Sequence, residues 1–160
     1  MNNTTWVQNY IEDETGKQKA PSLDQWLAEA KSDPSSLQCG MYLCHNGVVR
    51  ATPKAAVREG KELDRIVQKL DFSYDSEKVL NAIERTKMLP GIFYVRVWLN
   101  EGILDVGNDI MMVLIGGDIR PRVAAALESL VGDLKSNCVT EKEIQKQRAN
   151  DPASYSSEAG

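Results

Sequence analysis

The chain has 160 residues, of which 42% are hydrophobic, and its 19 Lys and Arg residues against 23 Asp and Glu residues give a formal net charge of −4. A chain of this length buries about two-thirds of its unfolded surface, enough for one domain to form a core without metal or disulfide support. The acidic balance argues against a nucleic-acid binder, and the odd number of cysteines, three, argues against a disulfide framework and for a reducing, cytoplasmic setting.

The two ends of the chain are predicted to be poorly ordered. Residues 1–20 are polar and lack both sustained periodicity and the basic-then-apolar pattern of a secretory signal. Residues 147–160 are small and polar, with too few apolar side chains to offset the entropy of ordering. We therefore expect a single domain over residues 21–146, with a disordered tail after it.

The first predicted element is a short amphipathic helix that begins after Ser22. Ser22 and Gln25 have the spacing of a capping box, in which two side chains satisfy the first backbone N–H groups of a helix. Asp33 and Pro34 end the helix. Its apolar residues have helical spacing: Leu23, Trp26, Leu27 and Ala30.

A strand is predicted over the apolar run Gly40–His45. The following pair, Asn46–Gly47, is compatible either with a hairpin turn into Val48–Arg50 or with a strand that continues through a bulge at the glycine. Residues 51–65 mix basic and acidic side chains with one proline and one glycine. We expect a charged, mobile loop there.

The middle of the chain predicts a strand, a helix and a second strand. Residues 70–74 alternate apolar and polar side chains, which is typical of a strand with one buried face. Asp75–Ser76 favours the start of a helix, and Pro90–Gly91 ends it. The β-rich run Ile92–Trp98 follows.

Two strands and a helix complete the predicted domain. A short strand at Ile103–Leu104 precedes Ile110–Ile115, which is predicted to be a central strand and is far shorter than the 18 to 20 or so residues that span a bilayer. A helix with Pro121 in its first turn ends near Lys135. This order predicts an α+β fold with helices on one face of a mostly antiparallel sheet: a ferredoxin-like α/β sandwich with extra antiparallel strands.

Four basic residues are candidates for a binding or catalytic site. Arg50 follows a strand, where its guanidinium can hold a phosphate or carboxylate or remain solvated. Arg120 lies in the first turn of a helix, which favours a nearby anion or a pairing with Asp118. Lys135 closes that helix, where the helix dipole favours a lysine even if it has no function. Lys142 lies in a polar stretch typical of ordinary surface.

The cysteines and the one histidine do not predict a metal site. Cys39, Cys44 and His45 lack a second pair of ligands at zinc spacing, so we interpret them as core thiols and a structural histidine. Cys138 lies near the lysines and is interpreted as a buried small residue. The sequence carries no Ser-His-Asp pattern, phosphate-binding loop or dinucleotide fingerprint.

The elements and the residues at their ends together resemble the catalytic (large) subunit of molybdopterin synthase. The family's strand ending in Gly-x-Val-Arg is matched by Gly47–Arg50, and its Gly-x-Leu-x-x-Gly-Asp turn by Gly102–Asn108. Its helix-opening Arg, helix-closing Lys and second Lys are matched by Arg120, Lys135 and Lys142, which are 15 and then 7 residues apart.

The resemblance covers roughly residues 38–143 and includes two departures from the family pattern. Ile119 stands where the family has a histidine, and Glu141 stands where the family has an aromatic residue. A divergent member is therefore expected. Because Ile119 cannot share a proton, we expect slower turnover or a substitute donor.

The resemblance implies a hammerhead-like form of the α/β sandwich and a cytoplasmic sulfurtransferase of molybdenum cofactor biosynthesis. Such an enzyme inserts sulfur into cyclic pyranopterin monophosphate to form the molybdopterin dithiolene. The sulfur donor is a small ubiquitin-like carrier with a C-terminal Gly-Gly thiocarboxylate, and two catalytic subunits form the central homodimer of a heterotetramer. No metal, other cofactor, nucleic acid or membrane is implied.

The resemblance also assigns roles to the four basic residues. Arg50 and Arg120 bind anionic substrate groups, Lys135 performs the covalent or proton-transfer step, and Lys142 positions the thiocarboxylate or an intermediate. The alternative is a non-catalytic dimeric homologue that binds the sulfur carrier or a pterin without efficient turnover. An unrelated α+β module would not bring the four residues together.

Overall fold

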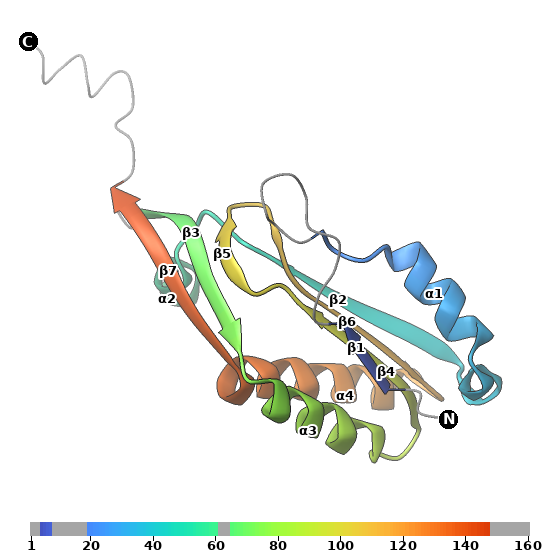
Figure 1. Ribbon diagram of the computed structural model, residues 1–160. Helices are drawn as coiled ribbons and strands as arrows, with labels where there is room; N and C mark the ends of the chain where they lie inside the picture. Colours follow the sequence, from blue (N-terminus) through green and yellow to red (C-terminus); the bar gives the residue numbers. More distant parts are fainter. Residues whose placement is uncertain (1–3, 8–18, 61–64, 148–160) are drawn as a thin grey trace, which may run out of the picture.

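The computed structural model of the chain describes residues 4–7, 19–60 and 65–147 and contains two sheets (Figure 1). The four-stranded sheet has the order β1 (Thr4–Val7), β4 (Ile92–Leu99), β6 (Asp109–Gly117) and β2 (Met41–Val48). The three-stranded sheet has the order β5 (Gly102–Asp105), β3 (Arg65–Tyr74) and β7 (Val139–Gln147). All pairs are antiparallel except β1 with β4.

Four α-helices accompany these sheets in the described part of the chain. They are α1 (Leu23–Ser32), α2 (Lys54–Glu59), α3 (Ser76–Lys87) and α4 (Arg120–Asp133), with a 3₁₀ turn at Pro34–Gln38 and a π-helical turn at Leu134–Cys138. Within the described ranges, no helix is both long and apolar enough to cross a membrane. The mixed, mostly antiparallel architecture confirms the α+β class.

The four-stranded sheet is apolar on both faces, and each face is covered by helix. Helices α3 and α4 lie on one face and α1 lies on the other (Figure 1). The α3–α4 face buries the odd-numbered strand residues Val95, Val97, Leu99, Met111, Val113 and Ile115. The α1 face buries Tyr94, Trp98, Met112 and Leu114 against Trp26 and Ala30.

The placement of α1 corrects the prediction that the helices share one face of the sheet. Trp26 is 1% exposed and packs on the face opposite α3 and α4, because alternate side chains of β4 and β6 offer a second apolar surface there. Arg96 of β4 lies over the Trp26 ring at 4.4 Å and pairs with Glu29, which ties the helix to the strand.

Most predicted elements are present with nearly the predicted bounds. Helix α1 begins after Ser22, whose Oγ accepts the Gln25 N–H at 3.3 Å, and β6 is a central strand. Of the two alternatives at Asn46–Gly47, the continuous strand is correct, because β2 runs to Val48 with a register shift after Gly47.

Three parts of the chain differ from the prediction. The stretch predicted as a loop over residues 51–65 contains helix α2, which ends at Gly60 in a left-handed conformation (φ 65°), and residues 61–64 lie outside the described residues. Strand β7 was not predicted. Strand β1 lies within the N-terminal segment predicted to be poorly ordered, and the remainder of that segment and the tail from residue 148 lie outside the described ranges.

Candidate functional site

A small pocket forms where the end of β2, the start of α2, the π-helical turn and β7 meet. Its volume is about 80 Å³. The lining residues are Val48, Val49, Arg50, Lys54, Val67, Leu70, Ile110, Lys135, Glu141 and Glu143. Two of the four predicted site residues, Arg50 and Lys135, therefore lie at the same pocket.

Arg50 is held at the pocket by the backbone on either side of it. The Val49 N–H donates to the Asn108 carbonyl at 2.9 Å, and the Val49 carbonyl accepts from Gly107 at 2.8 Å. The Arg50 Nε then donates to the Thr52 carbonyl at 3.1 Å. Its two terminal nitrogens make no ion pair with the described residues, so they are available to an anion.

Lys135 reaches the pocket because α4 runs back along β6 and ends beside the start of that strand. The preceding residue, Leu134, is fully buried and anchors the π-helical turn in the core. Lys135 itself is exposed and makes no ion pair with the described residues. A partner that covers the pocket would desolvate it.

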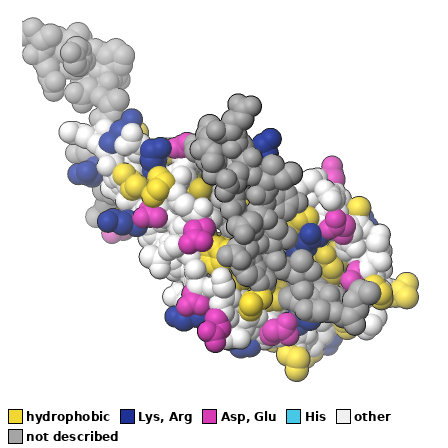
Figure 2. Space-filling model, in the orientation of Figure 1, with side chains coloured by type: hydrophobic (Ala, Val, Ile, Leu, Met, Phe, Trp, Pro, Cys, Tyr) yellow, Lys and Arg dark blue, Asp and Glu magenta, His cyan; other side chains and the backbone are white. Residues whose placement is uncertain are grey.

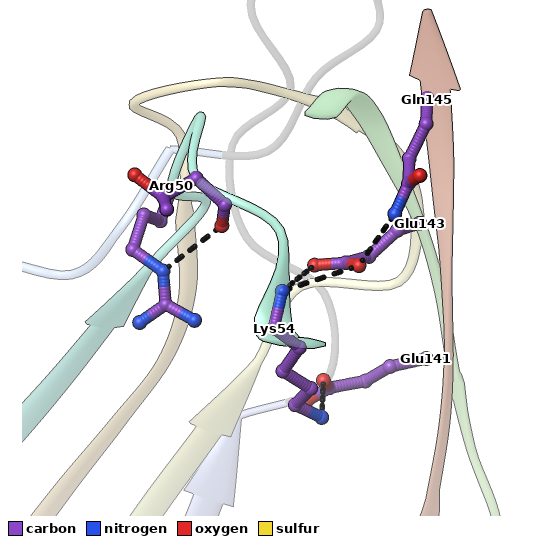
Figure 3. A network of polar contacts seen from close by, with 6 residues as sticks. Arg50, Lys54, Glu141, Glu143 and Gln145 are labelled. Carbon is purple, nitrogen blue, oxygen red and sulfur yellow. Dashed lines mark hydrogen bonds and ion pairs between the residues drawn. The ribbon is translucent and has the colours of Figure 1, made fainter. Parts of the chain in front are cut away.

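A network of polar contacts closes one side of the pocket (Figure 3). The Lys54 Nζ pairs with Glu141 Oε2 at 2.9 Å, and the Lys54 backbone N–H donates to Glu143 Oε2 at 3.1 Å. The Gln145 amide donates to Glu143 Oε1 at 3.1 Å. The three β7 residues point to the same side because alternate residues of a strand share a face.

The same alternation turns Lys142 away from the pocket. Lys142 is exposed and lies opposite Asp71 in the β3–β7 ladder, on the other face of the three-stranded sheet. In the space-filling view, Lys and Arg side chains gather over the end of the molecule where β3 and β7 lie (Figure 2). The structure thus does not bring Lys142 to Arg50 and Lys135.

Arg120 also lies apart from the pocket within one chain. It opens α4 and Lys135 follows its end, so the 15 intervening helical steps separate their backbones by about 22 Å. Asp118 pairs with Arg122 at 2.7 Å, not with Arg120. Ile119, in the position of the family histidine, is 51% exposed beside Arg120.

Three pocket residues were missed in the sequence: Lys54, Glu141 and Glu143. Lys54 lies in the stretch that we predicted as a loop. Glu141 and Glu143 alternate with Lys142 along β7. Had this stretch been predicted as a strand, the alternation would have placed the two glutamates on one face and Lys142 on the other.

The cysteines are placed as core or half-buried thiols. Cys138 is buried, and burial raises the pKa of its thiol, which opposes formation of the thiolate needed for sulfur chemistry. Burial likewise raises the pKa of Cys39 and of Cys44. In the part of the chain that the structure describes, no group of three or more His, Cys, Asp or Glu side chains is arranged to hold a metal ion.

His45 predicts a pH dependence of stability. Burial, followed by the charge of Lys135, holds its pKa below the usual value of 6.5. The unfolded chain therefore binds a proton on His45 more tightly than the folded chain does. The His45 contribution to the free energy of unfolding is fully present above about pH 6.5 and is lost as the pH falls below that value. We expect the unfolding temperature to fall less between pH 7.5 and 5.5 in His45→Leu than in the wild type, and equal falls in both would contradict this assignment.

Comparison of the sequence with protein-family models and with curated proteins gives no match. Solved structures do share the fold. The molybdopterin biosynthesis MoaE protein from Burkholderia ambifaria is 17% identical with a TM-score of 0.59, and the alignment covers 100% of this chain and 99% of that one. Molybdopterin synthase from Staphylococcus aureus is 14% identical with a TM-score of 0.60, covering 94% and 99%.

A third similar structure is the complex of subunits 1 and 2 of molybdopterin-converting factor from Helicobacter pylori, at 15% identity and a TM-score of 0.57, covering 94% of this chain and 92% of that one. The resemblance noted in the sequence is thereby confirmed at the level of the fold. The comparisons assign no role to individual residues.

Proposed function

We propose that this chain is the catalytic subunit of a molybdopterin synthase and inserts sulfur into cyclic pyranopterin monophosphate. The observation that carries the proposal is the meeting of Arg50 and Lys135 at one pocket. Both were selected in the sequence through the family resemblance, and they meet in a fold shared with molybdopterin synthase structures.

The charges of the pocket suit the proposed chemistry. A thiocarboxylate, the carboxylate left after sulfur transfer and the substrate phosphate are all anions. The guanidinium of Arg50 and the ammonium of Lys135, which make no ion pair with the described residues, can stabilise them. The thiocarboxylate sulfur forms a bond to a substrate carbon as that carbon loses an oxygen substituent. Water then breaks the bond between the sulfur and the carrier's acyl carbon, so the sulfur stays on the substrate and the carrier ends in a carboxylate. Lys135 is positioned to take up the acyl group or to move a proton in this exchange.

The size of the pocket supports binding of the carrier there rather than of the pterin. Ligand pockets usually measure about 300–1,000 Å³, whereas this one has about 80 Å³. We therefore assign it to the end of an extended chain. The pterin would bind beside the pocket, on a surface completed by a second chain.

The position of Arg120 supports a homodimer within a heterotetramer. Because Arg120 is about 22 Å from Lys135 along α4, it can serve the same reaction only from the second copy of the chain. The Helicobacter pylori complex of two subunits supports a small protein partner as well. Lys142 keeps its predicted role only if the second chain or the carrier reaches the outer face of β7.

Replacing Arg50 by methionine should weaken binding of the carrier about 10-fold or more, because a hydrogen bond to a charged group contributes about 1.5–3 kcal/mol. Isothermal titration with the carboxylate form of the carrier measures this loss. Lys31→Met removes one positive charge from α1, far from the pocket, and should bind as the wild type does. Equal weakening in both variants would indicate a general charge effect.

The proposed function is tested by mixing the chain with a thiocarboxylated carrier and following the carrier's intact mass. We expect conversion of the thiocarboxylate to the carboxylate only when cyclic pyranopterin monophosphate is present. Binding without conversion would instead indicate the non-catalytic homologue. Neither binding nor conversion would indicate an unrelated module with the same fold.

A further inference from the structure

We propose that two copies of this chain pair along the free edge of β2, antiparallel to each other, so that their four-stranded sheets join into one continuous sheet. The inference rests on the proposed function and deepens it, because it names the surface by which a second copy brings Arg120 to the pocket. It also gives a role in association to Ile119, at which this chain departs from the family pattern.

The first observation is that β2 is an edge strand without protecting charges. Among the described strands β2 pairs only with β6, so its other side presents unpaired backbone groups (Figure 1). None of its eight residues, Met41–Val48, is Lys, Arg, Asp or Glu, and its register shift lies only at its last step. Exposed edge strands are normally protected by charges, proline or central bulges, so this edge favours pairing with another strand.

Strand β7 shows the contrasting pattern. It is also an edge strand within the described part of the chain, since the three-stranded sheet has the order β5, β3, β7. Its charged residues are Glu141, Lys142, Glu143 and Lys146. The chain thus protects one long edge with charges and leaves the other uncharged, which identifies β2 as the edge that a second chain covers.

The second observation is that exposed apolar side chains lie at both ends of β2. The Gly40 N–H donates to the Gly117 carbonyl at 2.7 Å, which places the start of β2 beside the start of α4. Leu37 and Ile119 at this end are 93% and 51% exposed, and Val48 at the other end is 49% exposed. In an antiparallel pair related by a two-fold axis, the start of each strand meets the end of the other, so these apolar ends cover each other.

The third observation concerns the flank of α4 that lies toward the β2 edge. Helix α4 packs on β6 and β2, and its Asp133 pairs with Arg85 of α3 at 2.6 Å. At 3.6 residues per turn, Ala124 and Val131 lie roughly half a turn from Asp133 and therefore face away from α3. Ala124 is exposed and Val131 is half-buried. They offer an apolar contact to a second α4 on the same face of the joined sheet.

The proposed pairing also accounts for the distance between Arg120 and Lys135. It lays Met41 of the second copy opposite Val48 of the first, and the partner of Met41 in the β2–β6 ladder is Gly117, three residues before Arg120. The seven steps from Met41 to Val48 span about 23 Å, close to the 22 Å or so between Arg120 and Lys135 along α4. Arg120 of the second copy is thereby carried to the end of β2 that lines the pocket.

Ile119→Asp separates association from folding. Ile119 is the N-cap of α4 and makes no side-chain capping bond, whereas aspartate is a preferred N-cap, so the variant should be at least as stable as the wild type. It also places a charge from each copy into the proposed interface. We expect sedimentation velocity of the full chain to show a dimer whose dissociation constant rises about 10-fold or more in Ile119→Asp.

The control is Leu80→Asp, which adds the same charge at a 43% exposed position of α3, away from β2. Its dimer dissociation constant should equal that of the wild type. Hydrogen exchange of the backbone amides then locates the interface. The amides of β2 should exchange more slowly in the wild-type dimer than in monomeric Ile119→Asp, and those of β7 should exchange equally in both.

Three results would overturn the inference: a wild-type chain that stays monomeric at its highest soluble concentration, a dimer that Ile119→Asp does not weaken, or a dimer whose β2 amides gain no protection. The carrier-conversion experiment reports separately on the proposed function. Conversion by a monomeric chain would remove the inference and leave the function, whereas a dimer paired along β2 without conversion would leave the inference and remove the function.

Discussion

Replacing Lys135 by alanine is expected to lower the rate of molybdopterin formation by at least about 100-fold, because a residue that moves a proton or carries the acyl group contributes about 10²–10⁴-fold. Lys135 is exposed and makes no ion pair with the described residues. The variant should therefore fold normally and still bind the carrier, so that the loss lies in the chemical step.

The control for this result is Lys31→Ala, which removes a lysine from α1 on the other face of the sheet and should retain full activity. Lys142→Ala provides a second comparison, since the alternation of β7 places that lysine outside the pocket. The geometry of one chain predicts a smaller loss for Lys142→Ala than for Lys135→Ala. Equal losses would mean that the outer face of β7 also meets the reactants.

Replacing the neighbouring Leu134 by alanine is expected to destabilise the chain by about 2–5 kcal/mol, the usual cost of emptying a buried leucine site. Leu134 is fully buried in the cluster beneath α3 and α4 and anchors the turn that carries Lys135. Urea unfolding followed by circular dichroism measures the change in the free energy of unfolding.

Lys135→Ala serves as the matched control for stability, with an expected change within about 0.5 kcal/mol. Leu134→Ala thus tests stability, and Lys135→Ala, at the next position, tests the chemical step. A small effect of Leu134→Ala, below about 1 kcal/mol, would contradict the packing described for the π-helical turn.

The elements that sequence reasoning found are those specified by local signals. Caps and helical periodicity identified α1 and α3, and continuous apolar runs identified β4 and β6. Strand β7 has no such signal, because its residues are mostly polar and it forms by pairing with β3 from Tyr74–Val139 to Arg65–Gln147. Helix α2 is only six residues long and gave no periodicity to detect.

The site was predicted in part for the same reason. Arg50 and Lys135 were selected through the resemblance, whose spacing reflects positions in a folded structure. Lys54 and Glu141 are 87 residues apart in the sequence, and their side chains meet at 2.9 Å because the start of α2 lies against β7 in the folded chain. Lys142 was predicted together with Lys135 because spacing along the chain does not reveal which face of a strand a residue occupies.

The most direct test of the central claim is a single turnover of the wild-type chain with a thiocarboxylated sulfur carrier and cyclic pyranopterin monophosphate. Molybdopterin is detected as its fluorescent oxidation product. A catalytic subunit predicts product in an amount limited by the thiocarboxylate supplied, despite Ile119 in place of the family histidine. No product, with a folded chain and a carrier that remains thiocarboxylated, would contradict the proposal of a synthase.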